Sequence, residues 1–539
     1  MDRADRADSS DSSARAAAGP LPDGPAAPDA STAPAPSGGG RGRPAPPPDG
    51  AGEDALIRHL TALRAGDLPV RGGRTMAYVY DAGLPGLDRI AARAHDAFAG
   101  VNGLDMTAFP SVVALENDVV GRAAALLGGG PATAGTFTSG GTESCLLAVL
   151  TAREHARRTR GVTRPEIVLP ATAHAAFHKA ARLFGLDPVV VDVDPRTFRV
   201  RPRDVAAALG DRTALVVASA PSYAHGVVDP VAEVAAHAAG CGVLCHVDAC
   251  VGGWYLGHLR MARELPAPPP FDLSVPGVTS LSVDLHKYAY TPKGASVLLF
   301  RDAELRRHGW FAHAGWPGYP VVNATLQGTK AAGPLAAAWA VLRHVGTAGY
   351  AELSRQVHLA TRRIVAGADR IGGLRVLGEP DASLVALAAD DPAVDPFTVA
   401  DEMRRRGWYL QPQPAFGGSP ANVHLTVTGA VAAPGRTDEL LAELAAATAR
   451  ARELGPPPAP DPALLELAAA LDPRAPAPDE AAAVLAAAGL TPGGPLPERM
   501  APVLAVLQAL PEPLAERLLP EVVSRLYTAA QDPGEDGAA

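Results

Sequence analysis

The chain has 539 residues, enough for more than one ordinary domain and for a large buried core. Its formal net charge of −9 provides no overall basic field, so we expect neither nucleic acid nor a membrane surface among its partners. No uncharged apolar stretch reaches the roughly 18–20 residues that span a bilayer, and the first residues contain no apolar segment typical of a signal peptide. We therefore predict a cytoplasmic protein.

The four cysteines are Cys145, Cys241, Cys245 and Cys250. Three of them crowd one apolar stretch and its exit, which is not the pattern of a secreted disulfide framework. His246 could join them as a metal ligand. However, Cys241 and Cys245 fall in a predicted strand, where cysteine packs as a small hydrophobic residue. We therefore predict no metal site.

Composition divides the chain into five regions. Residues 1–50 are rich in Ala, Pro, Gly, Ser and Asp, and are predicted to be a disordered tail. Residues 51–115 form an N-terminal helical segment. Across residues 116–330 helices alternate with short β-branched strands, which predicts a large domain with a mostly parallel sheet. Residues 331–454 form a smaller α/β domain, and residues 455–539 form a proline-rich linker followed by a helical appendage.

The periodicity of apolar residues predicts the individual elements. In chain order, helices are expected at 86–99, 112–127 and 145–157, strands at 166–169, 188–193, 214–218, 243–247, 278–285 and 296–300, and helices at 331–344 and 351–371. The smaller domain and the appendage are expected to contain strands at 383–388 and 422–428 and helices at 397–406, 462–471, 479–490 and 498–529.

A lysine and an aspartate follow two of these strands. Lys287 stands behind His286 in a polar loop, and Asp248 closes the earlier strand. Open α/β sheets bind ligands beyond the carboxyl ends of their strands. A lysine amine can form a Schiff base with a carbonyl cofactor, and a carboxylate can keep a pyridine nitrogen protonated so that the ring accepts electrons. The pair predicts pyridoxal phosphate as the cofactor.

The segment Ser139-Gly140-Gly141-Thr142 opens a strong helical pattern. Small residues let backbone amides approach an anion, and the helix N-terminus adds a partial positive charge. By itself such a segment could be a simple capped turn. Its position ahead of the lysine and the aspartate favours a phosphate site.

Two histidines, His174 and His178, are spaced four residues apart. On one helix face they could bind zinc, but the glutamate of a zincin motif is missing, so we expect no metal there. We predict that His174 stacks on the pyridine face and that His178 is an ordinary surface histidine.

These motifs together resemble a known family. Ser-Gly-Gly-Thr-Glu-Ser at 139–144, the His174 segment, His-Val-Asp-Ala-Cys at 246–250 and Ser-Val-Asp-Leu-His-Lys at 282–287 occur in the order seen in sphingosine-1-phosphate lyases. Those enzymes belong to the pyridoxal-phosphate-dependent group II decarboxylase superfamily. The resemblance covers roughly residues 55–450. It implies the α/β architecture called fold type I, in which a large pyridoxal-phosphate-binding domain precedes a smaller C-terminal domain.

Position by position, the resemblance implies roles for individual residues. Lys287 would be the Schiff-base lysine, Asp248 the partner of the pyridine nitrogen and His174 the stacking residue. The phosphate region would include Ser139, Gly141, Thr142, Ser282 and His286. Gly328 and Thr329 resemble the loop by which one subunit contacts the phosphate in its neighbour's site, which implies a homodimer with shared active sites. Tyr80, Asn102, Asp105 and Lys293 would face the substrate.

Two residues depart from the family pattern. Asp105 stands where the family has a histidine that helps to hold the substrate's phosphate, and Lys330 stands where an arginine is usual. A carboxylate beside a phosphate is repulsive, and a lysine lacks the bidentate grip of an arginine. The departures predict a preference for a substrate without that phosphate. The alternative is that Asp105 turns away to cap a local turn.

Three functions remain open. The first is a carbon–carbon lyase of the sphingosine-1-phosphate lyase type, which cleaves its substrate to an aldehyde and an amine by a retro-aldol reaction. The second is an L-amino-acid decarboxylase. The third is a catalytically altered protein that serves as a partner in a complex. The presence of Lys287, Asp248 and His174 together argues against the third.

Overall fold

A computed structural model of the chain describes residues 46–470, 486, 497–524 and 527. The predicted disordered tail therefore falls outside the described residues, except for residues 46–50, which form coil and a turn. The predicted helix 479–490 lies outside them as well, apart from residue 486. None of the helices in the described part of the chain is both long and apolar enough to cross a bilayer.

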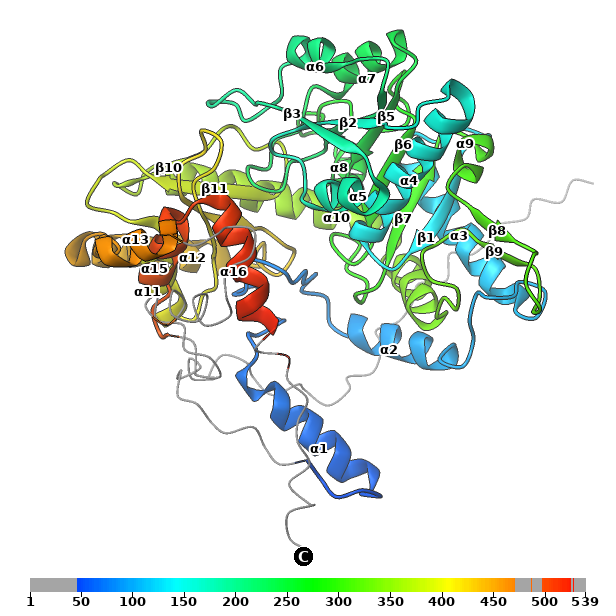
Figure 1. The fold of residues 1–539 in the computed structure, drawn as a ribbon. Helices are drawn as coiled ribbons and strands as arrows, with labels where there is room; N and C mark the ends of the chain where they lie inside the picture. Colours follow the sequence, from blue (N-terminus) through cyan, green and yellow to red (C-terminus); the bar gives the residue numbers. More distant parts are fainter. Residues whose placement is uncertain (1–45, 471–485, 487–496, 525–526, 528–539) are drawn as a thin grey trace, which may run out of the picture. The chain divides into compact units, whose positions relative to one another are not determined.

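A seven-stranded sheet organises the region between residues 134 and 300 (Figure 1). Only β7 runs against its neighbours β1 and β6, whereas the other pairs are parallel, so the sheet is mostly parallel as predicted. In spatial order the strands are β1 (Ala134–Thr138), β7 (Ser296–Phe300), β6 (Ser280–Asp284), β5 (Leu244–Asp248), β4 (Thr213–Ser219), β2 (Glu166–Pro170) and β3 (Asp187–Val191).

Each face of this sheet has its own core. In β4, Leu215 and Val217 pack in one apolar cluster with α4 (Gly141–Arg160) and α5 (Ala176–Phe184). The alternate residues Val216 and Ala218 pack in another cluster with α3 (Pro110–Leu126), α7 (Val231–Gly240) and α8 (Gly253–Leu259). Strands buried on both faces are continuous apolar runs, and this explains why the strands could be found in the sequence.

A long helical run links the two sheets. It is α10 (Gly333–Ala368), which packs against α2 (Leu87–Ala97), α3 and α8. Gly346 interrupts it with φ 65° and ψ 170°, between the two helices that the sequence predicts. Glycine adopts this conformation without strain because it has no Cβ. The N-terminal part also contains α1 (Glu53–Leu63) and the short 3₁₀ turn η2 (Arg64–Gly66).

The second sheet is antiparallel and has four strands. Their order is β10 (Leu374–Val376), β11 (Leu384–Ala389), β13 (Asn422–Thr426) and β12 (Gln411–Gln413). Two helices belong to this region, α11 (Pro396–Arg405) and α12 (Arg436–Leu454), and they pack on each other. The side chain of Asp395 accepts a 2.7 Å hydrogen bond from Thr398 N, and Pro396 follows it. An aspartate cap followed by a proline is a typical helix start.

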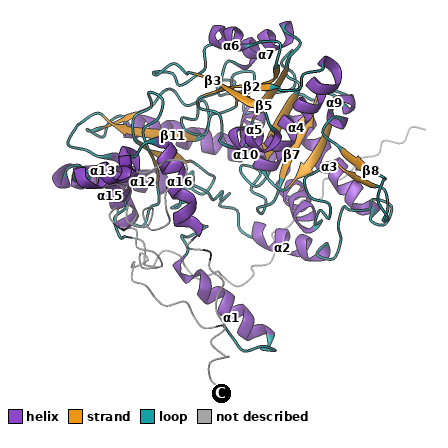
Figure 2. Cartoon of the chain, in the orientation of Figure 1, coloured by secondary structure: helices purple, strands orange, loops and turns teal. Residues whose placement is uncertain are grey.

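Shorter elements complete the described chain (Figure 2). They are α6 (Pro202–Ala208), α9 (Ala303–Arg307) and a hairpin of β8 (Phe311–His313) and β9 (Val321–Asn323). The appendage contains α13 (Pro462–Ala470), α15 (Ala501–Ala509) and α16 (Glu512–Ser524), which share an apolar cluster. Asp401 of α11 accepts hydrogen bonds from Met500 N and Ala501 N, so the smaller domain caps the start of α15.

One local prediction is wrong. Cys241 does not lie in a strand but ends α7 as an exposed residue, and β5 begins only at Leu244. Gly242 takes a positive φ of 66° and turns the chain between the helix and the strand. The other three cysteines are buried.

Candidate active site

A cavity of about 350 Å³ opens at the carboxyl ends of β4, β5 and β6. The turn between β1 and α4 forms another wall. Chain segments far apart in sequence therefore meet at one sheet edge, as expected for a doubly covered sheet. Of the residues expected at the site, those that line this cavity are Ser139, Gly141, Thr142, His174, Asp248, His286 and Lys287.

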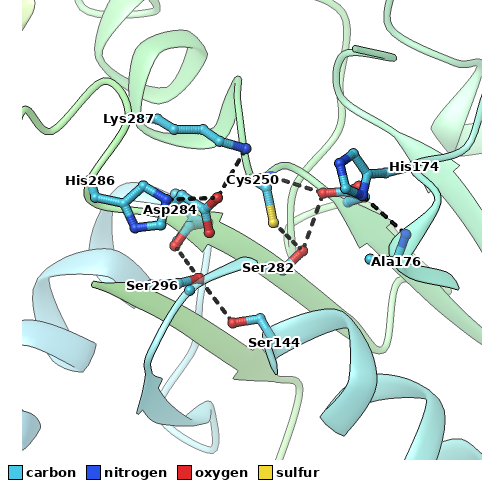
Figure 3. Close-up of polar contacts among 12 residues, drawn as sticks. Ser144, His174, Ala176, Cys250, Ser282, Asp284, His286, Lys287 and Ser296 are labelled. Carbon is cyan, nitrogen blue, oxygen red and sulfur yellow. Dashed lines mark hydrogen bonds and ion pairs between the residues drawn. The ribbon is translucent and has the colours of Figure 1, made fainter. Parts of the chain in front are cut away.

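Lys287 forms an ion pair inside this cavity (Figure 3). Its Nζ lies 2.9 Å from Oδ2 of Asp284, the last residue of β6. Burial by itself lowers the pKa of Lys287, but the charge of Asp284, together with those of Tyr80, Cys250 and Asp248, holds this pKa well above its usual value. Burial also acts on Asp284 by raising its pKa, yet the charge of Lys287, with hydrogen bonding in support, leaves it lowered. The pair is therefore charged, and Asp284 fixes the position of Nζ.

Asp284 was not predicted as a site residue, although it stands three residues before Lys287 in the same motif. Asp284 also explains why position 141 is a glycine. A Cβ added to Gly141 would lie 2.6 Å from Asp284 Oδ2, so a larger residue would collide with the carboxylate. Oδ1 of Asp284 is buried and has no hydrogen-bond partner in the described chain. This unpaired oxygen indicates that a polar group of a ligand belongs in the cavity.

His286 lies beside the same carboxylate. Its Nε2 is 3.6 Å from Asp284 Oδ2, and its Nδ1 accepts a 3.3 Å hydrogen bond from Ala295 N. Burial lowers the pKa of His286, with Lys293 and Lys287 adding to the shift. A neutral imidazole with a hydrogen on Nε2 fits these contacts.

Hydrogen bonds fix the carboxylate of Asp248. Its Oδ1 accepts hydrogen bonds from Cys250 N at 3.1 Å and from Ser282 Oγ at 3.4 Å. Ser282 was expected near the phosphate, but the β5–β6 register places it opposite Asp248 instead. The Ser282 hydroxyl also lies 3.2 Å from Nε2 of His246, a buried residue whose pKa burial lowers to about 4. A neutral His246 and Ser282 therefore orient Asp248 from the sheet side.

A buried glutamate shapes the turn between β1 and α4. Glu143 Oε2 accepts a 2.6 Å hydrogen bond from Ser139 N, and Oε1 accepts a 2.9 Å bond from Leu326 N. Both oxygens thus bond to backbone, which leaves the amides at the start of α4 to line the cavity. Glu143 joins this turn to the segment that carries Gly328 and Thr329.

His174 stands at the cavity edge just before α5. Its Nδ1 accepts a 3.1 Å hydrogen bond from Ala176 N, which leaves Nε2 on the far side of the ring. Tyr223, which the sequence did not single out, is another wall of the cavity. The Tyr223 hydroxyl donates a 2.5 Å bond to Gln411 Oε1, and its ring stacks on His424 at 4.5 Å. His178 is exposed on α5, as predicted.

Tyr80 and Lys293 lie near Lys287 but outside the cavity wall. The ammonium of Lys293 is 5.1 Å from the centre of the Tyr80 ring and donates a 2.9 Å hydrogen bond to Tyr78 O. Burial and the charge of Lys287 lower the pKa of Lys293. Burial raises the pKa of Tyr80. These groups form a rim where a bound molecule could meet a cation.

Four of the expected site residues lie away from the cavity that holds Lys287: Asn102, Asp105, Gly328 and Thr329. Asn102 forms an antiparallel bridge with Ala331, and Gly103 N donates a 2.8 Å bond to Lys330 O. Lys330 is bound in turn to Glu116 at 2.6 Å. The loop with Asn102 and the loop with Lys330 are therefore bonded to each other within one chain.

Asp105 caps its own turn. Its Oδ1 accepts hydrogen bonds from Thr107 N at 2.8 Å and from Thr107 Oγ1 at 2.6 Å. The bonds from Thr107 lower the pKa of the exposed carboxyl group. This geometry is the alternative stated for Asp105: the carboxylate keeps its charge but caps its own turn and does not line the cavity that holds Lys287.

A family model described as "Pyridoxal-dependent decarboxylase conserved domain" matches residues 82–386. The chain belongs to this family. Among curated relatives, it is 37% identical over 381 residues to the sphingosine-1-phosphate lyase of Oryza sativa subsp. japonica, which covers 69% of each chain. It is 34% identical over 404 residues to the sphingosine-1-phosphate lyase of Drosophila melanogaster, covering 75% of this chain and 72% of the relative.

Solved structures agree with this assignment. The sphingosine-1-phosphate lyase of Burkholderia pseudomallei K96243 matches with a TM-score of 0.71 and 36% identity, over 76% of this chain and 92% of that chain. A glutamate decarboxylase from Lactobacillus brevis CGMCC 1306 matches with a TM-score of 0.64 but only 20% identity, over 76% of this chain and 95% of that chain. This likeness shows the fold alone. This pyridoxal-dependent decarboxylase family member has fold type I and is a pyridoxal-phosphate-dependent carbon–carbon lyase similar to sphingosine-1-phosphate lyases. The predicted family, fold type, cofactor and enzyme class are therefore confirmed.

The cavity fits the cofactor. The small residues of the Gly140-Gly141 turn and the N-terminus of the 20-residue helix α4 offer backbone amides to a phosphate. Asp248 lines the same cavity with one carboxylate oxygen engaged by Cys250 N and Ser282 Oγ. The buried, unpaired Oδ1 of Asp284 lies against the Gly141 turn. The residues that line the cavity therefore suit a group that carries both an anion and a protonated ring nitrogen.

The thiols of Cys145 and Cys250 and the carboxylate of Asp248 lie within 4.8 Å of one another. The hydrogen bond to Cys145 and burial hold the pKa of Cys250 well above its usual value. The hydrogen bond to Cys250 lowers the pKa of Cys145, but burial and the charges of Asp248 and Asp284 together raise it. Metals bind thiolates, not thiols, so this set favours a packed pair of neutral thiols.

A second family model, for an HTH domain at the C-terminus of pyridoxal-dependent enzymes, matches residues 462–525. This segment carries eight acidic and four basic side chains. Nucleic-acid-binding domains of this kind depend on a basic face for their affinity. The charge of the segment therefore does not favour a nucleic-acid partner.

Proposed function

We propose that the protein cleaves the Cα–Cβ bond of a phosphorylated 2-amino-3-hydroxyalkane of the sphingosine-1-phosphate type, yielding an aldehyde and an amine. The observation that carries this proposal is the meeting of Lys287, Asp248 and His174 in one cavity of a chain that aligns over 69% of its length with a sphingosine-1-phosphate lyase. The rim supplied by Lys293, next to Tyr80, offers a cation to the substrate phosphate.

The residues then have separate tasks. Pyridoxal phosphate, when bound, stores the electron pair that bond cleavage releases. Asp248 keeps a proton on the ring nitrogen, and Ser282 and His246 hold Asp248 in place. His174 would pack on the ring face. Lys287 would hold the cofactor through its amine and would return a proton to Cα, with Asp284 orienting its Nζ.

Amides of the turn at Ser139, Gly141 and Thr142 bind the cofactor phosphate, with His286 beside them. No arginine is among the described residues that line this cavity. Part of the phosphate charge is therefore left for another chain to neutralise.

We further propose a homodimer in which the loop with Gly328 and Thr329 enters the partner's site. The support is a cluster of exposed apolar side chains beside this loop, around the β8–β9 hairpin: Phe311, Trp316, Tyr319 and Leu326 are between 44% and 58% exposed. Exposed apolar patches of this kind commonly mark protein interfaces.

Complementation tests the shared site. Chains with Lys287→Ala and chains with Thr329→Glu are each expected to be inactive. When they are co-expressed, the mixed dimer has one site with both an intact lysine and an intact loop, so activity should return to roughly a quarter of the wild-type level. Mixed dimers without activity would show that the loop acts within its own chain.

We also propose a cytoplasmic location. The support is that Cys145, Cys245 and Cys250 are buried free thiols, a state that suits a reducing compartment. Cell fractionation with an antibody to the protein tests this proposal, and recovery in the culture medium would contradict it.

Product analysis tests the reaction itself. Holoenzyme is incubated with sphinganine 1-phosphate and, separately, with a panel of L-amino acids, and products are detected by mass. We expect a long-chain aldehyde and phosphoethanolamine from the first and no CO₂ from the second. Release of CO₂ from an amino acid without aldehyde formation would establish the decarboxylase alternative.

A further inference from the structure

A second cavity of about 350 Å³ adjoins the catalytic one. It lies between loops of the seven-stranded sheet, at residues 171–175 and 223–225, and the segment 413–422 of the four-stranded sheet. The two cavities have His174 and Tyr223 as common walls. Cavities of this size commonly hold small molecules. Its position therefore places it directly beside the catalytic cavity.

The walls of this second cavity carry no formal charge. Alanines and the side chains of Val193, Phe198 and Phe416 form most of the surface. Apart from the shared His174, its histidine is His225, whose ring stacks on Phe198 at 3.9 Å and 7°. Burial lowers the pKa of His225 to about 4, so it is neutral at pH 7. A carboxylate or phosphate placed here would be desolvated without a counterion, and an occupant must therefore be uncharged.

Several polar atoms on these walls are unpaired. They are Thr172 Oγ1, His225 Nδ1, Gln413 Oε1 and Asn422 Oδ1, each buried and without a hydrogen-bond partner in the part of the chain that the structure describes. His225 is 2% exposed and Asn422 is 1% exposed. Folded proteins pair nearly all such atoms. The oxygens of Gln413 and Asn422 can only accept hydrogen bonds. The set therefore points to an occupant with a hydroxyl group, which can donate, on an otherwise apolar body.

We propose that this cavity binds the half of the substrate that leaves as the aldehyde, an alkyl chain whose first carbon bears the hydroxyl group. The proposal rests on the proposed function. In the cleavage, the hydroxyl loses its proton as the C=O bond forms, the Cα–Cβ bond breaks, and Cα gains a proton, so no oxidant is needed. The cavity selects for chain length and against acidic side chains.

Filling the cavity tests the proposal. Ala175 is exposed at the start of α5 and lines the cavity, so Ala175→Phe adds bulk there without entering a packed core. Ala224→Leu fills the cavity from another wall. Ala207→Phe, at an exposed position of α6, is the matched control.

For each holoenzyme, kcat/KM is measured on a long-chain and a short-chain phosphorylated amino alcohol. We expect the long-to-short ratio to fall by about tenfold or more in Ala175→Phe and Ala224→Leu, which corresponds to about 1.4 kcal/mol, and to remain unchanged in Ala207→Phe. An unchanged ratio in both filled variants would overturn the proposal while leaving the lyase function intact.

A binding measurement tests the cavity assignment separately from the proposed lyase function. An unreactive long-chain primary alcohol is titrated into each holoenzyme by calorimetry, and it should bind wild type and Ala207→Phe more tightly than the filled variants. If the alcohol behaves in this way but no substrate is cleaved, the proposed function fails and the cavity assignment stands. If the alcohol binds all variants equally, the cavity assignment fails.

Discussion

The ion pair between Lys287 and Asp284 defines the centre of the site at the scale of single residues. Lys287→Ala removes the only amine that lines the cavity among the described residues. We expect the purified variant to lack the near-visible absorption of lysine-bound pyridoxal phosphate and to be inactive. The control is Lys179→Ala, an exposed lysine on α5. If the absorption band of wild type persists unchanged in Lys287→Ala, the assignment is contradicted.

Asp248 supplies the negative charge for the ring nitrogen. Asp248→Asn keeps the shape and one hydrogen-bond acceptor but removes this charge, so turnover should fall by roughly several orders of magnitude while the cofactor remains bound. The control is Asp401→Asn, which changes a buried carboxylate that caps α15. Near-normal rates in Asp248→Asn, measured as aldehyde release, would mean that another group keeps the nitrogen protonated.

Asp105 is the residue at which sequence and geometry point to different outcomes. Because its Oδ1 is bound by the backbone and side chain of Thr107, we expect Asp105→His to change the preference for phosphorylated over unphosphorylated substrate by less than about threefold, well below the tenfold of 1.4 kcal/mol. The two substrates are compared by kcat/KM. A tenfold gain for the phosphorylated substrate would restore the electrostatic explanation.

Residues at strand ends were the ones that the sequence could predict. Lys287 and Asp248 follow apolar strands directly, and parallel strands bring such residues to one edge. Asp284 and Tyr223 were missed because their importance depends on contacts with Lys287 and Gln411 that form only in the folded chain. That Ser282 lies beside Asp248 was not predicted, because its neighbour is set by the register of β5 and β6.

At the scale of elements, a buried carboxylate joins β4, α7 and the segment before α6. Asp229 accepts hydrogen bonds from Ser219 N at 2.8 Å and from Val200 N at 3.2 Å. Burial raises its pKa to about 6, above the value of an unfolded chain. The folded state therefore binds this proton more tightly, and the resulting stability is complete below about pH 4 and is lost as pH rises through about 6.

Asp229→Asn tests this linkage. The free energy of unfolding is measured with urea between pH 4 and pH 7. In wild type, Asp229 should make this free energy higher at pH 4 than at pH 7 by on the order of 2–3 kcal/mol, and Asp229→Asn should lack this contribution. The variant is expected to be less stable overall, because an amide cannot accept both backbone hydrogen bonds as a carboxylate does. The control is Asp192→Asn, which changes an exposed aspartate. The same pH slope in wild type and Asp229→Asn would show that other groups set it.

Most elements were predictable because both sheet faces are covered. The buried strands are short apolar runs, and the helices between them have helical spacing, so β5 and α3 were found within a few residues of their observed bounds. The end of α7 was missed because Cys241 is apolar by residue type. Only the turn at Gly242 separates it from the strand.

At the scale of the whole molecule, the terminal regions differ in composition from the folded part. Residues 1–50 contain almost no large apolar side chains, so we expect that their removal leaves the core intact. A chain that starts near Gly50 should keep its cofactor, its thermal midpoint within a few degrees and its activity. A chain that starts near Gly72, which lacks α1, is the comparison. Precipitation or cofactor loss in the first truncation would contradict the prediction.

The pairing of β1 with β7 has a consequence for how the protein is made. Ala134 lies opposite Phe300, so the strand that leads into the Gly140-Gly141 turn must wait for the strand that follows the Lys287 loop. Contacts so distant in sequence form late, because a long loop has to close first. On the ribosome, a nascent chain therefore carries an unpaired β1 edge until residue 300 has emerged. The two halves of the cofactor site come together in that same closing step, so a prematurely terminated chain has neither a finished sheet nor a place for pyridoxal phosphate.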